Sequence, residues 1–182
     1  ESNKHVGEQK VERKVVAINL KGYIFSSEQC YALAEVLKVS TTIETLKIAP
    51  PKKMSSYPAW WEMTEDSACS IIQAMGKNTS ILNLELEKMR FGEGGADLLA
   101  AMLRTNKSCL ELGLNDCSLK RREAEELSLA LRCNTTLKRL SVARNDLESQ
   151  AGEALVSFLE ENYTLESLNL FKTGITTDVV GK

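Results

Sequence analysis

The side chains that most often carry out catalysis are sparse in this chain, and their spacing matches no catalytic or metal-binding motif. The single histidine, His5, lies in a polar stretch near the start, whereas a catalytic base or metal ligand needs partners placed beside it. Gly92, Gly94 and Gly95 form the segment FGEGGA, but the lysine of a phosphate-binding loop does not follow them. We therefore expect no enzyme activity, no cofactor and no metal ion.

The cysteines are the remaining reactive side chains, and their distribution does not suggest a disulfide framework. Their number is odd and no two form a closely spaced pair. We expect reduced thiols in a cytoplasmic protein. We place Cys30, Cys109 and Cys117 in the core. We place Cys69 and Cys133 near helix surfaces.

The elements that position these side chains follow from an internal repeat. Six segments start at residues 15, 43, 81, 109, 137 and 165, so that neighbouring starts are 28 residues apart, or 38 between the second and the third. Each has an apolar residue or cysteine at its first, fourth and sixth positions, as in LKRLSV and LESLNL. The fourth and sixth side chains lie on one face of an extended chain. Each repeat is therefore predicted to begin with a strand.

The second half of each repeat has helical periodicity. A column of small residues precedes apolar columns three and seven residues later, as with Ala124, Leu127 and Leu131. Such spacing forms the apolar face of a helix. Because a strand and a helix cannot bury their apolar faces alone, stacked repeats must share one core. The sequence predicts an α/β solenoid, a horseshoe with parallel strands on the concave face and helices on the convex face.

The L-x-x-L-x-L pattern in 28-residue units resembles leucine-rich repeats of the ribonuclease-inhibitor-like class, over residues 15–182. Similar repeats occur in the actin-capping tropomodulins, NOD-like receptors and cytoskeletal scaffold proteins. The chain departs from the family at the Asn or Cys position after each strand, where only Cys117 and Asn145 fit. Some turns must therefore satisfy their backbone groups in another way.

Three segments depart from the repeat. Residues 1–14 do not match its columns, ten extra residues fall within about 50–63, and the sixth repeat has its strand without its helix. We therefore divide the chain into a non-repeat segment, 1–14, and a repeat domain, 15–182, whose last repeat is truncated. Because terminal repeats need caps, we expect the chain to be a fragment.

The strand residues between the apolar positions are predicted to point into the concave face. There the central repeats are acidic and are bordered by basic residues of the outer repeats, including Lys21, Lys47, Arg144 and Lys172. A carboxylate patch with a basic rim would steer a protein that carries a basic segment. The residues expected to bind a protein on this face are Glu85, Glu87, Glu111, Asn115, Asp116 and Arg139. They could equally be ordinary solvated residues.

The extra residues of the second repeat contain Trp60 and Trp61, the only tryptophans of the chain. Loops of repeat proteins often carry function, and tryptophan is a favoured interface anchor. Both are therefore candidate protein-binding residues. The alternative is that at least one ring folds back onto the helices.

Taken together, these features predict a non-enzymatic protein-interaction module or scaffold of the cytoplasm or cytoskeleton. The net charge of -2 and the lack of a long apolar run make nucleic acid and membranes poor candidate partners. Two alternatives follow from the resemblance: a GTPase-activating protein similar to the Ran GTPase activator, and the ligand-sensing repeats of a NOD-like receptor.

Four Asn-x-Ser/Thr triplets match the acceptor sequence for N-linked sugar, but they recur in repeat register at Asn78, Asn106, Asn134 and Asn162. A shared register indicates a structural need at the turn from helix to strand. We expect these asparagines to adopt the left-handed conformation that often ends a helix, with the hydroxyl bonded to nearby backbone.

Overall fold

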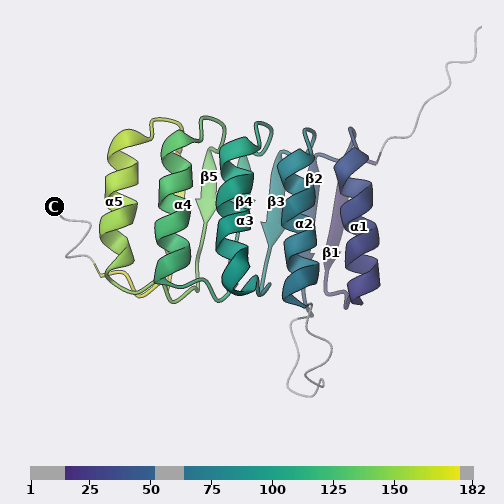
Figure 1. Cartoon of the computed structure of the whole chain (residues 1–182), viewed down its shortest axis with the longest axis horizontal. Helices are drawn as coiled ribbons and strands as arrows, with labels where there is room; N and C mark the ends of the chain where they lie inside the picture. The colour runs from purple at the N-terminus through teal and green to yellow at the C-terminus, as the bar shows by residue number, and fades with distance from the viewer. Residues whose placement is uncertain (1–14, 52–63, 177–182) are drawn as a thin grey trace, which may run out of the picture.

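A computed structural model describes residues 15–51 and 64–176, and within them strands and helices alternate along the chain. All five helices form one layer in chain order, and the strands form a second layer behind them (Figure 1). The elements are β1 (Ala17–Lys21), α1 (Ser27–Val39), β2 (Thr45–Ala49), α2 (Glu65–Lys77), β3 (Asn83–Leu86), α3 (Gly92–Thr105), β4 (Glu111–Gly113), α4 (Arg121–Cys133), β5 (Arg139–Ser141), α5 (Ala151–Glu161) and β6 (Ser167–Asn169).

The six strands form one parallel sheet in the order β1-β2-β3-β4-β5-β6. Equivalent repeat positions lie side by side across it, so that Leu46 pairs with Leu84, Leu84 with Leu112 and Leu112 with Leu140. Each helix packs against its neighbours in sequence. The predicted α/β repeat solenoid is confirmed.

One apolar core runs between the two layers. The fourth and sixth strand positions face it, and Leu84, Leu86 and Leu112 are at most 2% exposed. The helices contribute their predicted columns, such as Ala124, Leu127 and Leu131. Because every strand turns alternate side chains to this core, its remaining side chains must face the solvent on the other side of the sheet.

The asparagines of the Asn-x-Ser/Thr triplets connect each repeat to the one before it. Asn106 shows the pattern: its Nδ2 donates to the carbonyl oxygens of Met75 at 2.8 Å and Asn78 at 3.0 Å, and its Oδ1 accepts from the backbone N–H groups of Ser108 and Cys109. Asn78 and Asn162 repeat it, and Asn134 does so with a single carbonyl acceptor, that of Leu103. The triplets thus serve the turn from helix to strand.

Their expected backbone conformation was wrong. Asn106 has φ -70° and ψ 131°, which is extended, and the other three asparagines are extended as well. The side chain performs the task that we assigned to a left-handed backbone, because its amide has both donors and acceptors for four backbone groups.

Among the described residues, left-handed residues occur instead shortly after every strand except β2. Gly22, Lys88, Asp116, Arg144 and Lys172 all have φ between 56° and 88°. The backbone N–H groups of the first four donate to carbonyl oxygens of the following repeat. One turn geometry therefore continues the hydrogen bonding of the sheet beyond the strands.

Several predictions concern residues outside the described ranges. These are the non-repeat segment 1–14, most of the extra loop and the end of the sixth repeat. Among the helices of residues 15–51 and 64–176, none has the length and apolar character needed to cross a membrane.

Candidate protein-binding face

The solvent side of the sheet, which we call the strand face, collects the polar side chains that lie between the core positions. It carries the third, fifth and seventh residues of each repeat, and the parallel register aligns them in rows. With six strands about 4.8 Å apart, the face is roughly 24 Å wide. That width suits a protein interface of standard size.

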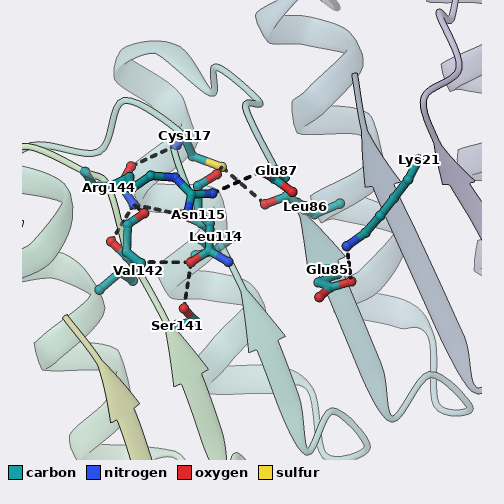
Figure 2. A network of polar contacts seen from close by, with 12 residues as sticks. Lys21, Glu85, Leu86, Glu87, Leu114, Asn115, Cys117, Ser141, Val142 and Arg144 are labelled. Carbon is teal, nitrogen blue, oxygen red and sulfur yellow. Dashed lines mark hydrogen bonds and ion pairs between the residues drawn. The ribbon is translucent and has the colours of Figure 1, made fainter. Parts of the chain in front are cut away.

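Glu85 lies on β3 between two lysines of the preceding strands. Its Oε2 is 2.8 Å from the Nζ of Lys21 and 3.2 Å from the Nζ of Lys47; Figure 2 shows the first of these pairs. Burial by itself raises the pKa of Glu85, but hydrogen bonds and attraction from both lysines outweigh it. The pKa of Glu85 is therefore lowered and the carboxylate stays ionised at neutral pH.

The other two predicted glutamates are also paired. Nε and Nη2 of Arg139 both donate to Oε1 of Glu111, the first at 2.9 Å. Arg144 reaches across β4 to Glu87, with 3.0 Å between its Nη2 and the Oε1 of Glu87 (Figure 2). Cations from neighbouring repeats therefore balance the carboxylates that we expected to form an acidic patch.

Asn115 and Asp116 follow β4, but they differ in their side-chain contacts. Oδ1 of Asn115 accepts from the Ser141 hydroxyl at 2.6 Å and from the backbone N–H of Ala143 at 3.1 Å. Asp116 is half-buried in its left-handed turn, and its carboxylate has no hydrogen bond or ion pair among the described residues. Asn115 therefore belongs to the hydrogen-bond network of the face, whereas Asp116 is free to meet a partner.

A hollow of about 330 Å³ lies in the middle of the strand face. Its floor includes Gly113, which has no side chain between Glu85 on β3 and Ser141 on β5. A Cβ at this position would lie 3.1 Å from the Cγ of Glu85. Further polar residues line the hollow, among them Lys47, Asn83, Glu111, Arg139, Ser167 and Asn169.

The strand pattern places Gly113 on this face, but it does not predict that the missing side chain opens a hollow. A glycine in a row of larger residues was the available signal. Phe171, which is 60% exposed, was also left out of the predicted binding residues. The Nζ of Lys172 lies 5.4 Å from the centroid of its ring. Trp60 and Trp61 lie outside the described residues.

The cysteines are placed as the repeat predicted. Cys30, Cys109 and Cys117 are buried, Cys69 is partly exposed and Cys133 is exposed, and all five are free thiols. Burial raises the pKa of Cys109 and of Cys117 to about 12. These two are therefore protonated core side chains and poor nucleophiles. Among the described residues, no group of three His, Cys, Asp or Glu side chains is arranged to hold a metal ion.

Comparison with known proteins finds similarity in structure alone. No protein-family model matches the chain, and no curated protein does either. The tropomodulin C-terminal domain of Caenorhabditis elegans superposes with a TM-score of 0.66 at 15% identity, over 86% of this chain and 88% of that one. Leiomodin-1 Actin-Binding Site 2 gives a TM-score of 0.49 at 16% identity, over 85% of this chain and 69% of that one. The tropomodulin likeness establishes a shared fold.

Proposed function

We propose that this protein is a non-enzymatic interaction module that holds another protein against its strand face. One observation carries the proposal: a polar, six-stranded face has a hollow at its centre, formed by residues from several repeats. Packing does not require this hollow, because the core lies on the other side of the sheet. A rigid, wide surface with a central depression suits a folded partner.

The charge pairs of the strand face support recognition of a partner by the positions of its charges. Glu85, Glu87 and Glu111 are each held by a cation from another repeat, so their charges have fixed positions before a partner arrives. Preorganised charges reduce the ordering needed on binding. They also select partners with the complementary arrangement. Cations of this chain already pair with these carboxylates, and a partner with a basic segment stays a prediction.

Site-specific photo-cross-linking in the source cell tests this function. A photoreactive amino acid is placed at Asn83 or Ser167 on the strand face, and at the exposed Gln73 or Ala101 on the helices as matched controls. We expect a discrete cross-linked protein from the strand-face positions only. That protein is then purified and its Kd measured. Cross-links from the helix positions alone would contradict the proposal.

Purified actin is a suitable first probe in a binding assay, because the repeats of this sequence resemble those of the actin-capping tropomodulins. Cosedimentation of the chain with filaments, lost on replacing Asn83 by arginine, would identify actin as the partner. If actin fails to bind while the cross-linked protein binds the strand face, the proposed function stands with another partner.

A further inference from the structure

The first repeat forms one end of the stack, with β1 as the outermost strand and α1 as the outermost helix (Figure 1). It exposes an apolar position that every later helix buries. Val36 is 52% exposed, but the residues at the same position of the later helices are at most 2% exposed: Ala74, Met102, Ala130 and Phe158. Phe158 is buried on the last described helix, so this position faces the preceding repeat.

Tyr23 shows the same contrast at the turn after β1. It is 64% exposed, but its equivalents in the later repeats are at most 2% exposed: Met89, Cys117, Asn145 and Thr173. Val15, at a core position of the strand, is 60% exposed. Ala32 is exposed as well, and it has the position of Glu126, which meets Arg104 of the preceding helix. We call Val15, Tyr23, Ala32 and Val36, together with β1, the first-repeat edge.

This edge is not built to receive another repeat of the same kind. In the later repeats an asparagine donates its amide to the preceding helix, as Asn106 does. The equivalent residue of the first repeat is Ser40, whose hydroxyl oxygen accepts from backbone N–H groups of its own turn. Residues 1–14 lack the repeat columns and contain seven charged residues, with Val6 and Val11 as their large apolar residues. Because a terminal repeat in water needs a polar outer face, the apolar edge indicates a partner.

We propose that the first-repeat edges of two copies of this chain pack together around a two-fold axis perpendicular to the sheet. β1 then pairs antiparallel with β1 of the second copy, and the two α1 helices lie antiparallel in one layer. An open edge strand without proline is a template for such pairing. The one charged residue of β1, Lys21, is already engaged by Glu85.

Packing of the first repeat of one copy on the last repeat of another is less favourable. Arg122 and Asp97 show which positions of adjacent helices meet, with 3.9 Å between Nη2 and Oδ2. In a head-to-tail stack these two positions hold Glu28 and Glu153, so two carboxylates would face each other. The amide that fastens one repeat to the next would also be missing, since Ser40 replaces it.

The two-fold arrangement brings opposite charges together. The first turn of α1 is acidic at Glu28 and its last turn is basic at Lys38. When the antiparallel helices overlap along their length, each acidic turn lies beside the basic turn of the other copy, and the helix dipoles are opposed. Lys38 donates to Glu35 of its own helix and keeps two further donors for this contact.

The edge is large enough for a reversible dimer. It is roughly 25 Å long and two layers, roughly 20 Å, thick, so about 500 Å² of flat area on each copy meets the other. The total of about 1,000 Å² is at the lower limit for a specific interface. We therefore expect a dimer in exchange with the monomer. Both strand faces lie on the same side of the joined sheet and remain open to other proteins.

Sedimentation equilibrium of the full chain, at concentrations up to about 1 mM, tests the proposal. We expect the mass to rise from 20.2 kDa to twice that value and no further. Val36→Glu puts a carboxylate into the interface and should weaken dimerisation roughly tenfold or more. Val39→Glu is the matched control, because Val39 lies on the same helix at a position that is exposed on every helix. Its dimerisation should match that of the wild type.

A second control tests the other end of the stack. Leu159 is 43% exposed, and its position faces the following repeat, since the equivalent Leu37 of the first repeat is fully buried. Leu159→Glu should therefore dimerise like the wild type. Thermal unfolding checks that each variant is folded.

Masses above that of a dimer, lost in both Val36→Glu and Leu159→Glu, would show head-to-tail stacking and overturn the proposal. A monomer at every concentration would overturn it too, and would leave the edge to residues 1–14 or to a different protein. The proposed function does not depend on this result, because cross-linking from the strand face is measured separately.

Discussion

Single side chains hold adjacent repeats together, and the buried asparagines do so most directly. Each amide takes the place of several backbone partners at a turn where neither the helix nor the strand supplies them. The sequence revealed this position by its recurrence every 28 residues. It did not reveal how the asparagine acts. Asparagine is favoured both where the backbone is left-handed and where a side-chain amide must bond backbone groups.

Replacing Asn106 by alanine removes four hydrogen bonds to backbone groups from a residue that is 4% exposed. The backbone groups left without partners should lower the free energy of unfolding by about 3 kcal/mol. Asn162→Ala is the matched control, since Asn162 makes the same contacts at the end of the fifth repeat but is partly exposed. Its loss should be smaller because water replaces the amide. Urea unfolding followed by circular dichroism measures both, and equal losses would refute the burial argument.

The carboxylate of Glu85 should make stability depend on pH. Its pKa is lowered in the folded protein, so its contribution is present above the ordinary glutamate pKa of about 4.3 and is lost as the pH falls through the lower, folded value. Glu85→Gln should therefore unfold at lower urea than the wild type at pH 7, and the difference should vanish near pH 2. The difference is small because the side chain is 36% exposed.

The lysines provide the control for this pH effect. In a Lys21→Gln, Lys47→Gln background only the effect of burial remains, so the pKa of Glu85 should be raised and the pH-dependent difference caused by Glu85→Gln should reverse its sign. A difference between wild type and Glu85→Gln that grows as the pH falls would contradict the sign of the shift.

Thiol reactivity should separate the cysteines by burial. Cys133 is exposed, whereas Cys109 and Cys117 are buried and have pKa values of about 12. A thiol reagent at pH 8 should modify Cys133 first, and Cys133→Ser should remove that fast phase. Cys109 and Cys117 should react only when the protein unfolds. Rapid modification of either one in the folded protein, located by mass spectrometry, would show that the core is open there.

Strands and helices were predictable because the repeat presents each apolar pattern several times. The period of two in LKRLSV and the columns three and four residues apart in the following helix gave β5 and α4 without ambiguity. What the pattern could not give was the pairing of surface charges. Arg144 contacts Glu87 two repeats away, and the reach of a long side chain is not encoded in the repeat period.

The glycines at the start of α3 meet two structural requirements, a left-handed turn at Gly92 and close packing against Phe91 at Gly95. Gly92 has φ 64°, and a Cβ there would collide with the Glu65 carboxylate. A Cβ on Gly95 would collide with Phe91, whereas Gly94 faces open space. The segment FGEGGA is therefore a turn and a helix start, as its lack of a lysine indicated.

Alanine substitutions should distinguish these glycines. Gly92→Ala should destabilise the protein by about 1 to 2 kcal/mol because an L-residue is strained at this φ. Gly94→Ala should stabilise it by about 0.5 to 1 kcal/mol, because alanine restricts the unfolded chain and favours the helix. Thermal unfolding compares the two variants directly. A stabilised Gly92→Ala variant would contradict the left-handed conformation.

The whole molecule is a stack in which each repeat contacts its neighbours, and function follows from what the stack aligns. Equivalent strand positions form rows across one face, so residues far apart in sequence line one hollow. The fold could be predicted because the same strand and helix patterns recur in every repeat. The hollow could not be predicted, because it arises where Gly113 leaves a row of strand residues without a side chain and where the surrounding charged residues pair with residues of other repeats.

The central claim is that the strand face, and not the helical side, holds the partner. Its most direct test is the Kd of the cross-linked partner for two charge-matched variants: Asn83→Arg in the hollow and Gln73→Arg on α2. We predict at least tenfold weaker binding for Asn83→Arg and a Kd within twofold of wild type for Gln73→Arg. Unchanged binding by Asn83→Arg, with weakened binding by Gln73→Arg, would contradict the account and place the interface on the helices.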